Sequence, residues 1–310
     1  MTSPQTPVMP ASPNRRGVIL PAAIILVYSI IVSRLPLLNY LGYEYSAAVA
    51  LIFPIVPGLF YLRLVDGTPG ALPRVLRLAF LCLILPLVVG FLNALVVKNC
   101  SPGEGLGWFL LLPALGMVWV VALAYFYAAT FKRPTLWYII LLAGVMLHPL
   151  WLGYFTPRVD SYHFVYGYFP GFTYDEDLRI DSVLILWRAV TLVCAAGLFL
   201  AGGILAEKRK RRERAAGLRN GVDGTISRSD DVSSSDGSPG RGTASQPAAL
   251  MGLRAVVLTA VVVSLVAVWI YRTDLGFETT AGSLRRSLGS LAETRHFRIW
   301  YDSSAINAKE

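Results

Sequence analysis

An apolar segment followed by a basic cluster lies in the second half of the chain. Residues 182–206 read SVLILWRAVTLVCAAGLFLAGGILA, and residues 208–214 follow as KRKRRER. About 20 apolar residues cross a hydrocarbon core of roughly 30 Å, so the first stretch predicts a transmembrane helix. Clusters of lysine and arginine beside a span face the cytoplasm. The helix therefore ends on the cytoplasmic side of a membrane.

Six further apolar runs have the same character. They are bounded by charged residues and cover residues 17–33, 45–62, 78–97, 105–131, 134–157 and 255–271. Backbone groups in lipid must bond within their own segment, so each run predicts a helix. The first run could be a secretory signal, but it lacks a small-residue cleavage site and we interpret it as an uncleaved anchor. The predicted fold class is all-α, a polytopic membrane helix bundle with seven transmembrane helices.

The basic residues set the orientation of this bundle. Alternation from the cytoplasmic cluster at 208–214 also places Arg15 and Arg16, the loop that carries Arg63, and the turn at residues 132–134 on the cytoplasmic side. The acidic loop at residues 158–181 falls outside. Because all loops agree, the positive-inside rule predicts an N-in/C-out topology.

The same runs divide the chain into five segments. Residues 215–247 are rich in Gly, Ser, Asp and Arg and cannot bury enough apolar area to fold, which predicts disorder. We therefore expect a cytoplasmic N-terminus, a six-helix transmembrane unit, a basic then disordered cytoplasmic linker, a seventh helix and an extracytoplasmic tail. These cover residues 1–16, 17–206, 207–249, 250–271 and 272–310.

Composition argues against several classes of function. Hydrophobic residues make up 55% and charged residues 15% of the chain, against roughly 25% charged in soluble domains. The net charge of +9 lies beside the spans and does not indicate nucleic acid. The expected partners are the lipid bilayer and other membrane or envelope proteins. Common phosphate-binding, zinc-hydrolase and serine-hydrolase motifs are missing, so we predict no cofactor and lean against an enzyme.

The loop at residues 158–181 is the densest candidate site. It combines aromatic, Gly and Pro residues with one histidine and several carboxylates. Histidine and carboxylate groups together could bind a metal ion, or through it a lipid phosphate. The alternative is an interfacial aromatic loop whose acids are solvated, and the spacing fits no closed site. The candidate contacts are Asp160, His163, Asp175, Glu176 and Asp177.

Arg188 is the one charge well inside an apolar run. Such a charge costs about 2.5–3.5 kcal/mol on insertion scales, so it should pair or reach the interface. Asp181 lies seven residues earlier on the same helical face and is the expected partner. The alternative is an arginine that binds substrate. With His148 and several prolines in the spans, it would suit a permease-like transporter.

The tail carries a strand-like pattern. Residues 293–302 read ETRHFRIWYD, in which Phe297, Ile299 and Tyr301 share one face of a strand. A lone strand is unstable by itself. The segment resembles the opening of bacterial extracytoplasmic domains of the gluzincin, or peptidase MA-like, type, which begin with a short helix and a strand of the form Glu-Thr-x-His-Phe-x-Ile-x-Tyr. This likeness covers about the last 20 residues.

The resemblance implies a bacterial cytoplasmic membrane and a peptidase-like tail, and it brings no catalytic residue. The family's zinc motif is absent from the chain, and His296 would be a structural strand residue. The chain would be a membrane module cut short, or one that has lost its peptidase part. Our leading hypothesis is a non-catalytic module that anchors an extracytoplasmic peptidase-like segment. The alternatives are a permease-like transporter subunit and an enzyme on lipid-linked substrate at the outer face.

Overall fold

The computed structural model describes residues 15–65, 72–97, 101–155, 162–168, 178–226, 248–278 and 280–302, and these are mostly helical. The helices are α1 (Arg15–Val32), α2 (Tyr43–Leu64), α3 (Leu72–Ala94), α4 (Pro102–Phe109), the π-helical segment η2 (Leu110–Ala114), α5 (Leu115–Thr130), α6 (Pro134–Phe155), α7 (Ser182–Ile226), α8 (Ala248–Ile270) and α9 (Ala281–Leu288). Two antiparallel hairpins complete the fold, formed by β1 (Tyr162–His163) with β2 (Gly167–Tyr168), and by β3 (Gly289–Glu293) with β4 (Arg298–Asp302).

Within the described residues, five helical segments are long and apolar enough to cross a membrane. They are Tyr43–Leu64, Val75–Ala94, Pro102–Thr130, Ser182–Glu213 and Gly252–Ile270. The apolar parts of the two other expected spans are shorter over the described residues, at Ile19–Val32 and Pro134–His148. Large apolar side chains are exposed along α1, α3, α6 and α8. A soluble protein rarely exposes so much apolar surface, so the fold is that of a membrane protein.

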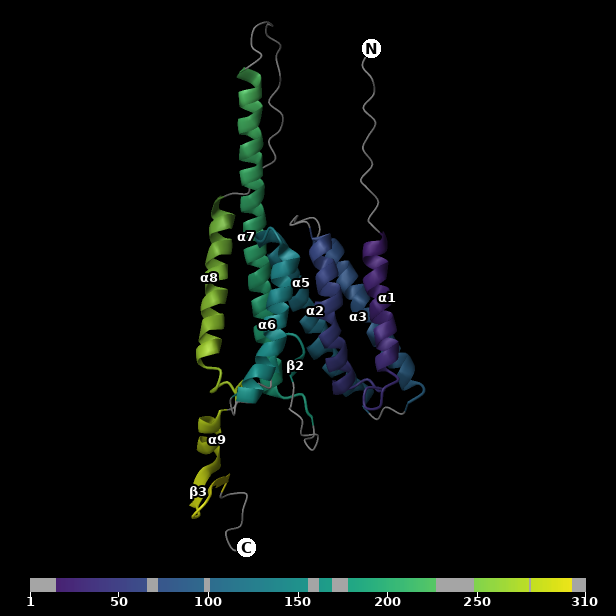
Figure 1. Ribbon diagram of the computed structural model, residues 1–310, viewed down its shortest axis with the longest axis vertical. Coiled ribbons are helices and arrows are strands. Elements are labelled where there is room, and N and C mark those ends of the chain that lie inside the picture. Colours follow the sequence, from purple (N-terminus) through teal and green to yellow (C-terminus); the bar gives the residue numbers. More distant parts are fainter. Residues whose placement is uncertain are drawn as a thin grey trace.

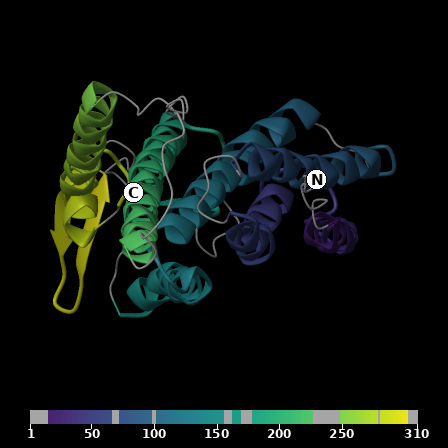
Figure 2. The ribbon, with the colours of Figure 1, turned by 90° about the horizontal axis from the view of Figure 1, so that it is seen from above.

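The helices pack in a row with α5 near its middle. Contacts run from α8 to α7, α5, α2 and α1, while α3 lies against α1 and α6 against α5 (Figure 2). Small residues allow the close approaches. A side chain at Gly202 of α7 would lie 2.8 Å from the Tyr125 ring of α5, and one at Gly58 of α2 would overlap the Tyr138 hydroxyl of α6. These contacts build the core from neighbouring helices.

The bundle has two different ends. The helix α1 begins at one end, and the α9–β3–β4 tail lies beyond the opposite end (Figure 1). We call the first the basic end, because Arg63, Lys132, Arg133 and residues 208–212 lie there. We call the other the hairpin end, because β1 and β2 lie there. Successive long helices run in alternate directions between them.

The helix α7 extends further than the sequence pattern predicts. It continues beyond the apolar run to Ile226, through the first part of the segment for which we predicted disorder. Residues 208–218 consist mainly of Lys, Arg, Glu, Ala and Leu, which favour helix, and extending an existing helix is far easier than nucleating one. Residues 227–247 of the predicted linker lie outside the described part of the chain.

The tail forms a small unit in which the predicted strand has a partner. Thr280 caps α9 through a reciprocal bond with Ser283, and Gly289 ends the helix at a φ of 72°. The strand β4 covers most of the alternating segment and pairs with β3, with Leu291 opposite Trp300. The sequence of β3 does not alternate clearly, and its pairing was therefore not predicted.

Candidate functional site

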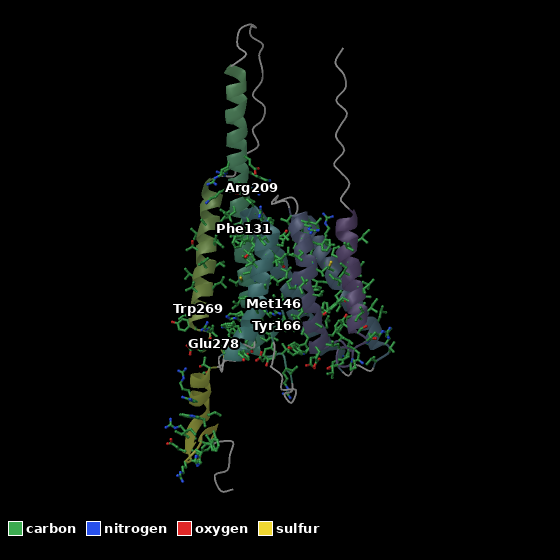
Figure 3. All side chains as sticks on the ribbon, viewed as in Figure 1. Phe131, Met146, Tyr166, Arg209, Trp269 and Glu278 are labelled. Carbon is green, nitrogen blue, oxygen red and sulfur yellow. The ribbon has the colours of Figure 1, made fainter. Side chains whose placement is uncertain are left out.

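The loop between α6 and α7 folds back into the bundle at residues 162–168. Val165 is 1% exposed, and the side chain of His163 is also buried. Tyr166 lies within the height of the bundle, not beyond its end (Figure 3). Strands of two residues do not form a stable hairpin in water, so the surrounding helices must hold this one. We call residues 162–168 the buried hairpin.

Aromatic contacts and one glycine fix the buried hairpin between α5 and α7. The Phe164 ring lies between Trp119 of α5, at 5.9 Å, and Trp187 of α7, at 4.9 Å between ring centroids. The Val165 carbonyl oxygen approaches Gly116 of α5 so closely that a Cβ there would lie 2.8 Å away. The hairpin therefore needs a residue without a side chain at position 116.

His163 joins the buried hairpin to α6 as a neutral imidazole. The Val165 N–H donates to its Nδ1 at 3.1 Å, so the ring proton is on Nε2, which donates to the Val145 carbonyl at 3.0 Å. In a regular helix this carbonyl would accept from the N–H of residue 149, which is a proline and has none. His163 therefore supplies the hydrogen bond that Pro149 removes.

Burial also determines the protonation of His163. Desolvation lowers the pKa of the imidazole to about 4, and the positive charge of Arg188 acts in the same direction, while the bond to the Val145 carbonyl opposes the shift. The imidazole is therefore uncharged near pH 7. Because both ring nitrogens are engaged within the protein, His163 offers no lone pair to a metal ion in this arrangement.

Arg188 lies beneath the buried hairpin and is 1% exposed. Its Nη1 donates to the Phe164 carbonyl at 3.2 Å and its Nη2 to the Leu112 carbonyl of η2 at 3.3 Å, whereas Nε has no hydrogen-bond partner among the described residues. Gly167 covers the guanidinium. A Cβ there would lie 2.1 Å from Nη2, and the φ of Gly167 is +86°. Only glycine fits both the space and the backbone conformation.

The expected pairing of Arg188 with Asp181 does not form. The Asp181 carboxylate accepts from the Leu184 N–H at 2.7 Å and caps the start of α7. Among the described carboxylates, none forms an ion pair with Arg188. Carbonyl dipoles from the hairpin and η2 solvate the guanidinium instead. Nor does Arg188 reach the interface, because its side chain is fully enclosed.

The other four predicted contact residues cannot be located relative to His163 and Arg188. Asp160, Asp175, Glu176 and Asp177 lie outside the described residues, so the metal or lipid-phosphate site remains a prediction from sequence. Within the described part of the chain, no three His, Cys, Asp or Glu side chains come together as a metal ion would require.

Sequence reasoning did not single out Phe277, which links the tail to the buried hairpin. Phe277 is 5% exposed, and its ring lies 4.9 Å from Trp187 and 5.8 Å from Tyr162. The next residue, Glu278, is buried at the hairpin end and forms an ion pair with Arg272 (Figure 3). A single aromatic residue beside a glycine, following a span, is too common a pattern to predict such a contact.

Comparisons with protein-family models, curated proteins and solved structures found no match to this chain. The chemistry of the site therefore rests on its own geometry. The buried polar side chains bond mainly to backbone carbonyls, and the histidine is neutral with both nitrogens engaged. This arrangement fixes the shape of a loop and presents no activated nucleophile or general base among these residues.

Proposed function

We propose that this chain is a multi-pass protein of the bacterial cytoplasmic membrane whose helices anchor and position an extracytoplasmic, peptidase-like tail. The proposal includes seven spans, which are the five long apolar segments together with the shorter helices α1 and α6, and it has the N-terminus inside and the C-terminus outside. The alternating helix directions, the basic residues at one end and the tail at the other support this topology. The resemblance of residues 293–302 to the start of peptidase MA-like domains supports the class of the tail.

The docking of Phe277 is the observation that carries the proposal. The chain leaves α8 at Ile270, and Phe277 then packs between Tyr162 and Trp187 before α9 begins at Ala281. Gly276 lies against Val183 of α7 at the same place. The tail therefore starts from a fixed point on the six-helix unit. A simple membrane anchor would need only α8, so these contacts favour positioning as well as anchoring.

The use of the buried polar groups supports a non-catalytic role. Arg188 was one of the residues that motivated the transporter hypothesis, and His163 was a candidate metal contact. Both bond to backbone groups that hold the hairpin. The hairpin in turn provides Tyr162, one side of the Phe277 contact. Arg188, His163 and the buried hairpin thus form a continuous support from the helices to the tail.

Distances between spin labels test the positioning. In a background with Cys82, Cys100 and Cys194 replaced by alanine, labels at exposed Arg34 and Arg286 report the separation of the bundle and α9. We expect a narrow distance distribution in the parent protein and a broad one in Phe277→Ala, because that change removes the docking ring. Phe297→Ala is the matched control, since Phe297 is 70% exposed in the same tail. An equally narrow distribution in Phe277→Ala would refute the positioning role.

The topology has a separate test. Alkaline phosphatase is active only outside the cytoplasm, and green fluorescent protein folds only inside it when exported unfolded. We expect phosphatase activity from a fusion after Glu310 and fluorescence from a fusion before Met1. The same compartment for both ends would remove the extracytoplasmic tail and the proposed function with it.

A further inference from the structure

The basic end of α7 forms a ring of charge around the helix. Residues 208–212 are Lys208, Arg209, Lys210, Arg211 and Arg212, and they are exposed apart from the half-buried Lys210. Successive residues of an α-helix are turned by about 100°, so five of them surround the whole helix. A protein partner with a flat surface would contact only one side of such a ring, whereas lipid headgroups that surround the helix would contact all of it.

The height of the ring matches one layer of a membrane. Five residues span about 7.5 Å along a helix. The headgroup region of each leaflet is roughly 5–8 Å thick, taking the difference between the whole bilayer and its hydrocarbon core. The ring directly follows the apolar part of α7, which ends at Ala206, and α7 rises beyond the other helices at this end (Figure 1). It therefore lies at the depth of the headgroups.

The described side chains neutralise little of this charge. Glu213 pairs with Arg209 at 2.9 Å, and Glu207 pairs with Arg254 of α8 at 2.5 Å. Lys208, Lys210, Arg211 and Arg212 form no ion pair within the described residues. Like charges three and four residues apart destabilise a helix, yet α7 continues through them to Ile226. An external negative charge would relieve that repulsion.

Other cations lie at the same end of the bundle. Arg63 ends α2, and Lys132 with Arg133 forms the turn between α5 and α6. Among the side chains described at this end, the acids are Glu207 and Glu213, and both are already paired. A basic segment beside a span attracts anionic lipid, and the attraction weakens within a Debye length.

We propose that residues 208–212 form a binding ring for anionic phospholipid headgroups of the adjacent leaflet. The headgroup phosphates accept hydrogen bonds from the lysine and arginine side chains on all sides of α7. This interaction fixes the depth of α7 in the bilayer and supports the helix where its own charges repel. It does not depend on the function of the tail.

Lipid that copurifies with the full-length protein tests the ring. The protein is equilibrated in nonionic detergent with equal amounts of phosphatidylglycerol and phosphatidylcholine, separated by gel filtration, and its bound lipids are quantified by mass spectrometry. We expect at least threefold enrichment of phosphatidylglycerol, falling close to onefold in Lys210→Gln/Arg211→Gln/Arg212→Gln. High salt should reduce the enrichment in the parent protein.

The matched control removes the same charge at the opposite end. Arg34, Arg286 and Arg295 are exposed and form no ion pair within the described residues, so their triple replacement by glutamine should keep the enrichment. Equal loss in both triple variants, or no enrichment in the parent protein, would overturn the proposal. So would tighter binding of a single-stranded RNA than of phosphatidylglycerol that is lost only in the ring variant. Circular dichroism confirms that each variant is folded.

Discussion

The two hairpins of this protein contain the same kinds of residue in opposite environments. The buried hairpin has two residue pairs, while the β3–β4 hairpin of the tail has five. The shorter one is enclosed by helices, whereas Phe297 and Ile299 of the longer one are more than half exposed. Each has a glycine at positive φ, a histidine and an associated arginine. Enclosure by helices, more than the number of paired residues, therefore decides how much each residue contributes to stability.

Replacing the glycines should give the largest difference in stability between the two hairpins. Gly167→Ala forces a non-glycine residue to a φ of +86° and places its Cβ 2.1 Å from Arg188 Nη2. Gly289 has a φ of +72°, but a Cβ there would meet nothing within 4 Å. We expect a loss of about 3 kcal/mol or more for Gly167→Ala and about 1 kcal/mol for Gly289→Ala. Thermal unfolding in one detergent measures both, and equal losses would contradict the enclosure of the buried hairpin.

The histidines should differ in their effect on pH dependence. The pKa of His163 is lowered to about 4 in the folded protein, against about 6.5 in an unfolded chain. Between these values the unfolded chain binds more protons, so stability rises with pH across this window and is lost as the pH falls. From pH 7 to pH 5 the expected loss due to His163 is about 2 kcal/mol.

Unfolding midpoints measured at pH 7 and pH 5 check this contribution. His163→Gln should reduce the difference between the two midpoints, because the titrating group is gone. His296→Gln, which changes an exposed histidine of the tail, is the matched control. A His163→Gln variant with the full pH dependence of the parent protein would show that other groups cause it.

The apolar runs predicted the helices because each run is a local property of the sequence. Lipid requires about 20 apolar residues and internal hydrogen bonds, and neither depends on distant residues. The described part of the chain has five segments that meet this length and two shorter apolar helices, all at the predicted places. The extension of α7 was missed because glycine, serine and charge suggested disorder, although the preceding span had already nucleated the helix.

The buried hairpin could not be predicted, because its contacts join residues far apart in the chain. The Tyr43 hydroxyl donates to the Tyr168 carbonyl at 2.8 Å, and Trp119 stacks on Phe164. The sequence did point to His163 and Arg188 as unusual polar residues. It could not show that their partners are carbonyls, because every residue has one and only the fold decides which come near. Asp181 was the obvious charged partner, and it caps α7 instead.

Replacing the arginines should give the smallest difference in stability. It also tests most directly whether backbone carbonyls solvate the charge of Arg188. Arg188→Lys keeps a positive charge inside the bundle but cannot reach both the Phe164 and Leu112 carbonyls, which Arg188 bonds through two nitrogens. Arg188→Met removes both the hydrogen bonds and the cost of the buried charge. We therefore expect the lysine variant to be less stable than the methionine variant, by about 1 kcal/mol.

Arg298→Lys in the tail is the control for the expected destabilisation by Arg188→Lys. Arg298 and its partner Glu293 are mostly exposed, so the ion pair is weak and a lysine can replace it without a measurable change in the unfolding midpoint. The three variants and the parent protein are compared by thermal unfolding at one pH and salt concentration. If Arg188→Lys were as stable as the parent while Arg188→Met lost stability, the charge itself would be required. That result would point to an acidic partner for Arg188 and would remove carbonyl solvation as the reason that a cation persists beneath the buried hairpin.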